Sequence, residues 1–160
     1  FLTVPEPLIQ KNFSRIMSLK DGTKKMSKSD PSDQSRINMT DDKDLIVSKI
    51  KKAKTDSAKL PENDKDINNR PELKNLYGIF SSIQNQTLDL TIDEFKGKNF
   101  SDFKNKLAEV LVEKIYPISN ETNKLLKDEK FIDQILLDGS EKAEVIAKKK
   151  VNDIKNIIGF

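Results

Sequence analysis

The sequence contains neither cysteine nor histidine in its 160 residues. Without cysteine, the chain forms no disulfide and offers no thiolate to act as a nucleophile or as a zinc ligand. Without histidine, it has no Ser-His-Asp triad, no imidazole general base and no HExxH metal motif. Several common classes of enzyme site are therefore excluded for this chain.

A long apolar run is missing as well. No stretch of about twenty apolar residues occurs, so we expect no membrane-spanning segment, and the first residues lack the charged and apolar regions of a secretory signal peptide. Charged residues make up 34% of the sequence and hydrophobic residues 35%, which predicts a lean core. The net charge of +3 comes from many charges of both signs. Such a balance permits an RNA partner without requiring one.

Residues 24–31 read Lys-Lys-Met-Ser-Lys-Ser-Asp-Pro and are the stretch most typical of a functional site. They bring three ammonium groups and two hydroxyls together, after a short apolar segment and the turn signal Asp21-Gly22. Lysine is a mobile point charge suited to phosphate, and hydroxyl and turn N–H groups can donate to phosphate oxygens. The stretch therefore predicts an anion-binding loop, with polyphosphate as its natural class of ligand.

Residues 25–29 spell KMSKS, which resembles the second signature of class I aminoacyl-tRNA synthetases. We call residues 24–31 the signature loop. Its flanks resemble tryptophanyl-tRNA synthetases of the bacterial type, and the resemblance covers nearly the whole chain. The segments that carry it are Val4-Pro5-Glu6-Pro7-Leu8-Ile9, Arg15-Ile16-Met17-Ser18-Leu19, Asp30-Pro31, Ser35-Arg36-Ile37-Asn38, Lys52-Ala53-Lys54-Thr55-Asp56, Arg70-Pro71-Glu72, Gly97-Lys98, Asp102-Phe103-Lys104 and Pro117-Ile118.

The resemblance implies an ATP site that includes the signature loop. Lys25 and Lys28 would be the catalytic residues and would meet the β- and γ-phosphates, while Ser27 and Ser29 would donate hydrogen bonds to ATP. Met26 would anchor the loop and offer its backbone near the adenine.

The adenine itself would lie near the backbone of Ile16 and Met17. No residue of the chain is expected to bind a metal directly.

The resemblance also implies the activity of the whole enzyme. Such an enzyme uses ATP with Mg²⁺ to convert tryptophan to tryptophanyl-adenylate and then transfers tryptophan to tRNA(Trp), acting as a homodimer in the cytoplasm. The family's first signature, of the HIGH type, needs a histidine, which this chain lacks. We therefore expect the C-terminal portion of a longer cytoplasmic enzyme, inactive alone but able to retain some affinity for tRNA.

Two other interpretations stay open. A tyrosyl-type class I synthetase shares the architecture, although its signature usually departs from KMSKS and the context of residues 53–56 favours the tryptophanyl type. A non-catalytic helical RNA-binding or interaction module is the second alternative. It predicts salt-dependent RNA binding without ATP dependence, and a parent gene without a HIGH-type motif.

The expected fold is mainly α. We expect residues 1–39 to be the C-terminal remnant of a Rossmann-like α/β catalytic domain that carries the signature loop, and residues 40–160 to form an α-helical tRNA anticodon-binding domain. Residues 15–19 are short and apolar, which predicts the last strand of the nucleotide-binding sheet, with its carboxyl end leading into the loop. The basic runs at residues 49–54 and 148–150 are candidate RNA surfaces, although such runs are more often the solvated face of a helix.

Helix starts are predicted where a side chain can cap the first turn or where proline takes the first helical position. These positions are Thr40, Pro71, Thr91 with Glu94 in a capping box, Ser101, Asp128 and Ser140. Helix ends are predicted at Gly97, Gly139 and Gly159, with a kink or an end at Pro117. Helical spacing favours core packing over base stacking for five aromatic residues: Tyr77, Phe80, Phe95, Phe100 and Phe103.

Overall fold

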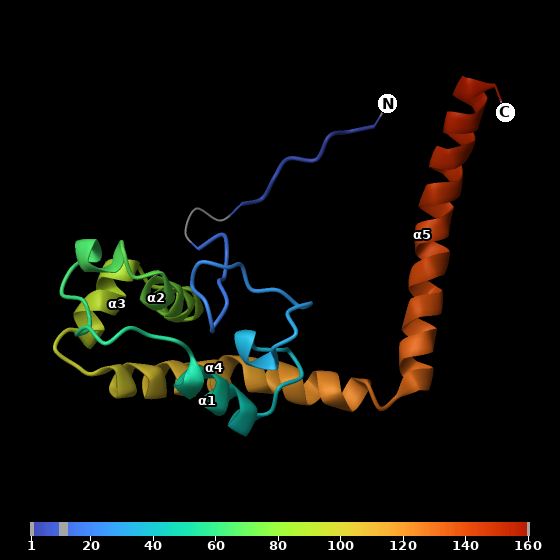
Figure 1. Ribbon diagram of the computed structural model, residues 1–160. Helices are drawn as coiled ribbons and strands as arrows, with labels where there is room; N and C mark the ends of the chain where they lie inside the picture. Colours follow the sequence, from blue (N-terminus) through green and yellow to red (C-terminus); the bar gives the residue numbers. More distant parts are fainter. Residues whose placement is uncertain (1, 10–12, 160) are drawn as a thin grey trace. The chain divides into compact units, whose positions relative to one another are not determined.

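The structure is a computed structural model that describes residues 2–9 and 13–159 (Figure 1). These residues form five α-helices and two short 3-10 helices, and their only β-pairing is an isolated bridge. The elements in chain order are η1 Asp33–Ser35, α1 Lys43–Lys52, η2 Asp64–Ile67, α2 Pro71–Gln84, α3 Leu88–Phe95, α4 Phe100–Leu125 and α5 Glu129–Ile158. The prediction of a mainly helical chain is confirmed.

The chain divides into two compact units, Phe1–Ser119 and Asn120–Phe160. The hydrophobic core belongs to the first unit. Among the described residues, its buried apolar side chains lie between Leu19 and Leu111, and α2 and α4 contribute most of them, five each. The predicted division at residue 40 concerns the domains of a longer protein and stays a prediction.

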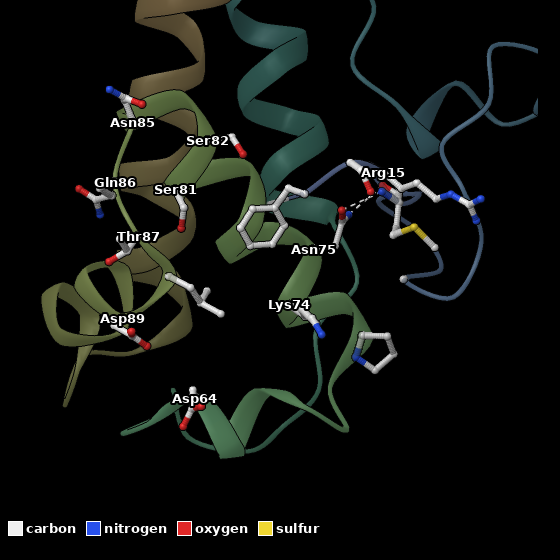
Figure 2. A pocket seen from close by; sticks show the side chains of 16 residues that line it. Arg15, Asp64, Lys74, Asn75, Ser81, Ser82, Asn85, Gln86, Thr87 and Asp89 are labelled. Atoms are coloured by element: carbon white, nitrogen blue, oxygen red, sulfur yellow. Dashed lines mark hydrogen bonds between the residues drawn. The ribbon is translucent and has the colours of Figure 1, made fainter. Parts of the chain in front are cut away.

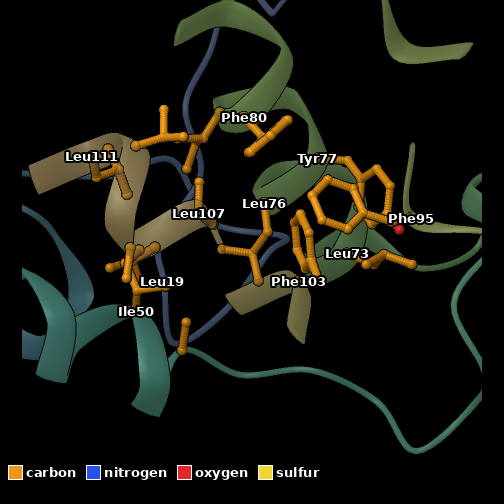
Figure 3. Packing of buried hydrophobic residues seen from close by; sticks show 14 of the residues in the cluster. Leu19, Ile50, Leu73, Leu76, Tyr77, Phe80, Phe95, Phe103, Leu107 and Leu111 are labelled. Atoms are coloured by element: carbon orange, nitrogen blue, oxygen red, sulfur yellow. The ribbon is translucent and has the colours of Figure 1, made fainter. Parts of the chain in front are cut away.

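Aromatic rings fill the centre of this core (Figure 3). Tyr77 of α2 stacks on Phe103 of α4 with 4.5 Å between ring centroids, and Phe95 of α3 meets Phe103 edge-on at 4.9 Å. Phe80 packs against Phe95 at 5.0 Å. Aromatic pairs in these geometries stabilise a core beyond the area that they bury. The prediction that these rings pack inside is confirmed, and Phe100 is half-buried at the edge of the cluster.

The first turns of α1 and α2 show how local signals set helix starts. Pro71 begins α2, as predicted, because its missing N–H has no partner in a first turn. The prediction of Thr40 as the cap of α1 was wrong by two residues. Asp42 is the cap, and its carboxylate accepts a hydrogen bond from Leu45 N at 2.8 Å.

The predicted starts of α3 and α4 were also displaced. Thr87, and not Thr91, caps α3, so the helix begins at Leu88, three residues before the predicted cap. The Thr91 hydroxyl lies 2.7 Å from the Ser81 hydroxyl in the core, and this hydrogen bond joins α3 to α2. For α4, the Asn99 side chain accepts from Asp102 N at 2.9 Å, two residues before the predicted cap Ser101.

Two helices continue where breaks were expected. Helix α4 runs through Pro117 to Leu125. Just after the proline, the buried Ser119 hydroxyl donates to the Asp41 carbonyl at 2.7 Å, a tertiary contact that favours the helical path. Helix α5 runs through Gly139 and Ser140, because one glycine costs a helix only about 1 kcal/mol.

The outer ends of α5 agree with the sequence. Asp128 caps the helix by accepting from Phe131 N at 3.1 Å, and Gly159 ends it with φ of 84°. Helix α5 carries apolar side chains along its length, but none of its described residues is buried. None of the described helices is both long and apolar enough to cross a membrane.

Candidate functional site

The signature loop begins in a short antiparallel hairpin, residues 16–26. Ser18 N donates to the Lys24 carbonyl at 2.8 Å, and Met26 N donates to the Ile16 carbonyl at 3.0 Å. Between these bonds, Met17 and Lys25 face each other as an isolated bridge. The structure therefore has a single bridge where residues 15–19 were expected to form a strand of a parallel sheet, because no parallel neighbour lies beside them among the described residues.

The turn of this hairpin is held by Asp21. Its carboxylate accepts from Thr23 N at 3.1 Å and from the Thr23 hydroxyl at 2.6 Å. These two hydrogen bonds, with a smaller contribution from Lys24, lower the pKa of Asp21. The Asp21-Gly22 turn predicted from the sequence is thus confirmed, and it returns the chain so that the signature residues follow directly.

The predicted site residues divide into an anchored and an exposed group. Ile16 and Met26 are half-buried and pack against the hydrophobic core, while the two lysines and two serines of the motif are exposed. The hydroxyls of Ser27 and Ser29 lie 3.0 Å apart, and the Ser29 N–H also points to the Ser27 hydroxyl at 3.3 Å. The two hydroxyls of the motif therefore lie side by side, and its two lysines are open to solvent.

Nearby ion pairs use lysines other than Lys25 and Lys28. Lys24 lies 3.4 Å from Asp21, and Lys54 lies 2.8 Å from Glu72. Lys49 pairs with two carboxylates and is fully buried. The prediction of residues 49–54 as a surface was therefore wrong for Lys49, whereas the lysines at 51, 52 and 54 and at 148–150 are exposed.

Arg36 fixes the exit of the signature loop, a role that sequence reasoning missed. Its guanidinium donates to the Asp30 carbonyl at 2.9 Å and to the Asn38 side chain at 2.9 Å. The Asp30 carboxylate in turn accepts from Ser32 N at 2.7 Å, and Lys20 donates to the Ser32 hydroxyl at 3.2 Å. Arg36 stands in a flank that matched the family, but its sequence position alone did not indicate these acceptors.

A hollow of about 1140 Å³ lies beside the hairpin (Figure 2). Its wall includes Arg15 and Met17 from the hairpin, Lys74 and Asn75 from α2, and the connection between α2 and α3. Neither Lys25 nor Lys28 lines it. The exposed motif and this hollow are thus separate features of the first unit. Among the described residues, no cluster of three or more acidic side chains is placed to hold a metal ion.

Comparison with known proteins decides the family. The sequence model described as tRNA synthetases class I (W and Y) matches residues 1–116. The chain belongs to this family. The matched residues include the signature loop, helices α1 to α3 and the larger part of α4.

Individual relatives agree with this assignment. The chain is 49% identical over 160 residues to the tryptophan–tRNA ligase of Agrobacterium fabrum, covering 100% of the chain and 45% of that protein. For the tryptophan–tRNA ligase of Rickettsia felis, the identity is 46% over 159 residues, covering 99% of the chain and 48% of that protein. The chain thus spans about half the length of these curated relatives and matches their C-terminal part.

A solved structure shares the fold. The crystal structure of tryptophanyl-tRNA synthetase from Mycoplasma pneumoniae superposes with a TM-score of 0.76 at 26% sequence identity. The match covers 94% of this class I synthetase chain and 45% of that structure.

Proposed function

We propose that this chain is the C-terminal part of a tryptophan–tRNA ligase. The complete enzyme would activate tryptophan with ATP to tryptophanyl-adenylate and transfer tryptophan to tRNA(Trp). The observation that carries the proposal is an exposed KMSKS loop on an anchored hairpin, in a chain that is 49% identical to a protein of that name. The division at residue 40, between a catalytic remnant and a helical tRNA-binding domain, belongs to the same proposal.

The signature loop would act by positioning and neutralising phosphate charge. A carboxylate oxygen of tryptophan attacks the α-phosphorus of ATP. The bond between the α-phosphorus and the oxygen that bridges the α- and β-phosphates breaks, and pyrophosphate leaves. No covalent bond to the protein is needed, so electrostatic stabilisation of the developing charge does most of the work. Lys25 and Lys28 would meet the β- and γ-phosphates, while Ser27 and Ser29 would donate hydrogen bonds to them.

ATP would arrive as its magnesium complex. Since the described residues hold no acidic cluster, this chain would contact the phosphates and leave Mg²⁺ to them and to the rest of the enzyme. The adenine would lie near the backbone of Ile16 and Met17. The backbone of Met26, whose N–H donates to the Ile16 carbonyl at 3.0 Å, would lie on the same side. The complete enzyme would be a cytoplasmic homodimer with tRNA(Trp) as its macromolecular partner.

The chain alone would not activate tryptophan, because it has no histidine for a HIGH-type motif. A tyrosyl-type enzyme is disfavoured, since the relatives matched along the entire chain carry the name tryptophan–tRNA ligase. A non-catalytic RNA-binding module would not need an exposed KMSKS motif on an anchored hairpin.

The test uses the complete enzyme and the substitution Lys28→Ala. Loss of one preorganised cation should slow tryptophan-dependent ATP–pyrophosphate exchange by about 100-fold, while tryptophan binding measured by calorimetry stays nearly unchanged. Lys59→Ala, an exposed lysine outside the loop, is the control and should retain exchange.

Equal losses of exchange and of tryptophan binding would count against the role of Lys28. Exchange that depends on tyrosine in place of tryptophan would move the chain to the tyrosyl type. RNA binding without any exchange would support the non-catalytic module.

A further inference from the structure

The outer edge of the hairpin strand is held by one side chain of α2. The Asn75 carboxamide oxygen accepts from Met17 N at 2.8 Å, and its nitrogen donates to the Met17 carbonyl at 2.8 Å. Figure 2 shows the Asn75 side chain directed at this backbone, with both bonds drawn. The two residues are 58 positions apart, and Asn75 is only 6% exposed.

This contact replaces a neighbouring strand. A carboxamide carries a donor and an acceptor in the same arrangement as a peptide group, so it can satisfy both polar groups of one residue at a strand edge. Asparagine is a weak helix former and gains nothing from a buried place in α2 except through such bonds. The position of Asn75 in α2 is therefore used to hold Met17.

The other side of Met17 faces the signature motif. Met17 is the bridge partner of Lys25, and the two flanking backbone bonds lock these strands together. A displacement of Met17 is consequently passed to Lys25 through one backbone pairing. Asn75 itself does not belong to the motif.

The turn of the hairpin meets α2 at a second point. A Cβ atom on Gly22 would come within 2.4 Å of Glu72 N and 2.5 Å of the Pro71 carbonyl carbon, so only glycine permits this approach. The Glu72 carboxylate is bound by Lys54 at 2.8 Å, and Lys54 N donates to the Leu19 carbonyl at 2.8 Å. The first turns of α2 thus contact the hairpin at Met17 and at Gly22.

We propose that Asn75 is a positioning residue for the ATP-dependent step, because its clamp on Met17 sets the place of Lys25 relative to the helical core. The proposal rests on the function proposed above. Asn75 acts on Lys25 through the backbone of Met17. Losing it should therefore alter how the enzyme uses ATP without altering how it binds tryptophan.

The experiment compares four variants of the complete enzyme with the wild type. Asn75→Leu removes both bonds at similar volume, Asn75→Asp keeps an acceptor for Met17 N, and Gly22→Ala forces the turn away from α2. Gln84→Leu makes the same chemical change as Asn75→Leu on the exposed surface of α2 and is the control. The readouts are kcat/KM for ATP and for tryptophan in pyrophosphate exchange, tryptophan binding by calorimetry, thermal unfolding, and amide hydrogen exchange of residues 16–26.

For Asn75→Leu, we expect kcat/KM for ATP to fall by about 10- to 100-fold, the size of effect that a small misplacement of a reacting group produces. Tryptophan binding should stay nearly constant, and amide exchange of the hairpin should become faster. Asn75→Asp should fall between Asn75→Leu and the wild type, Gly22→Ala should change ATP use in the same direction, and Gln84→Leu should match the wild type.

Four results would overturn the inference. Faster amide exchange with unchanged ATP kinetics would mean that the clamp holds the hairpin without serving the reaction. A parallel fall of ATP use, tryptophan binding and thermal stability would assign Asn75 a structural role alone. A wild-type enzyme without amino-acid-dependent exchange would overturn the proposed function and this inference together, whereas an active wild type with an equally active Asn75→Leu variant would overturn the inference only.

Discussion

The Lys49 ammonium lies 2.6 Å from the Asp41 carboxylate, with the two side chains 0% and 4% exposed. The same ammonium lies 2.7 Å from Asp33, which is half open to solvent. The Asp41 carboxylate also accepts from Asn38 N at 2.9 Å, and its backbone carbonyl accepts from Ser119. One buried lysine therefore ties the segment after the signature loop to α1, and Asp41 continues the connection to α4.

Replacing Lys49 by methionine should destabilise the chain strongly. The apolar part of the side chain is kept, but the buried Asp41 carboxylate loses its cation, and breaking a buried pair by removing one partner costs about 3 kcal/mol or more. The free energy of urea unfolding, followed by circular dichroism, measures this loss. Lys52→Met, at an exposed site in the same helix, is the matched control, and equal stability of the two variants would contradict the prediction.

Replacing Tyr77 by phenylalanine should stabilise the protein. The side chain is fully buried, and its hydroxyl has no hydrogen-bond partner among the described residues. Burial raises the pKa of Tyr77, so the phenol stays neutral. Its hydroxyl is therefore removed from water without a hydrogen bond that compensates for the loss. Removing the hydroxyl should raise the free energy of unfolding by about 1 kcal/mol.

Tyr116→Phe is the control for this substitution. Tyr116 is half-buried, and the Lys43 ammonium lies 4.5 Å from the centre of its ring. The substitution to phenylalanine keeps this ring and removes only the hydroxyl. A Tyr77→Phe variant less stable than the wild type would show that the hydroxyl has a favourable partner.

The ion pair of Asp56 with Arg70 should make the free energy of unfolding decrease at low pH. Arg70 donates two hydrogen bonds to the Asp56 carboxylate, at 2.7 and 2.8 Å, and these bonds lower the pKa of Asp56 below its ordinary value of 3.8. Because the pKa is lower in the folded state than in the unfolded chain, the stabilisation is complete above pH 3.8 and is lost as the pH falls through the folded-state pKa.

Urea unfolding between pH 7 and pH 2 tests this sign. Asp56→Asn should be less stable than the wild type at neutral pH, and the difference should shrink as the wild-type carboxylate becomes protonated. Asp93→Asn, at an exposed position of α3, is the control and should match the stability of the wild type at neutral pH. A difference between Asp56→Asn and wild type that grows toward low pH would refute the prediction.

Local signals in the sequence predicted the features whose partners lie within one helical turn. Pro71, Asp128 and Gly159 mark helix boundaries as expected, since a cap or a left-handed residue acts on its immediate neighbours. The same reasoning failed at Thr91, whose hydroxyl has a better partner across the core in Ser81. Sequence spacing cannot rank a local partner against a distant one.

The residues of the candidate site stay a prediction from the sequence, and the sequence did not indicate which side chains support the loop. The motif at residues 25–29 is contiguous, so its hydroxyl and ammonium groups are brought together by chain continuity alone. Arg36 and Asn75 support the loop from outside the motif, and their acceptors are backbone carbonyls, which every residue carries. Nothing in residue type distinguishes one carbonyl from another before the chain is folded.

The sequence by itself determined the helical character of the chain, the run of lysines and hydroxyls in its signature loop, and the absence of thiol and imidazole groups from the chain. These properties follow from residue types and short spacings. Tertiary structure alone decided that Lys49 of a basic run is buried and that Asn75 holds Met17. Burial and pairing depend on which distant segments pack together. Because a buried polar contact is shielded from water, removing one partner costs more stability than removing an exposed lysine.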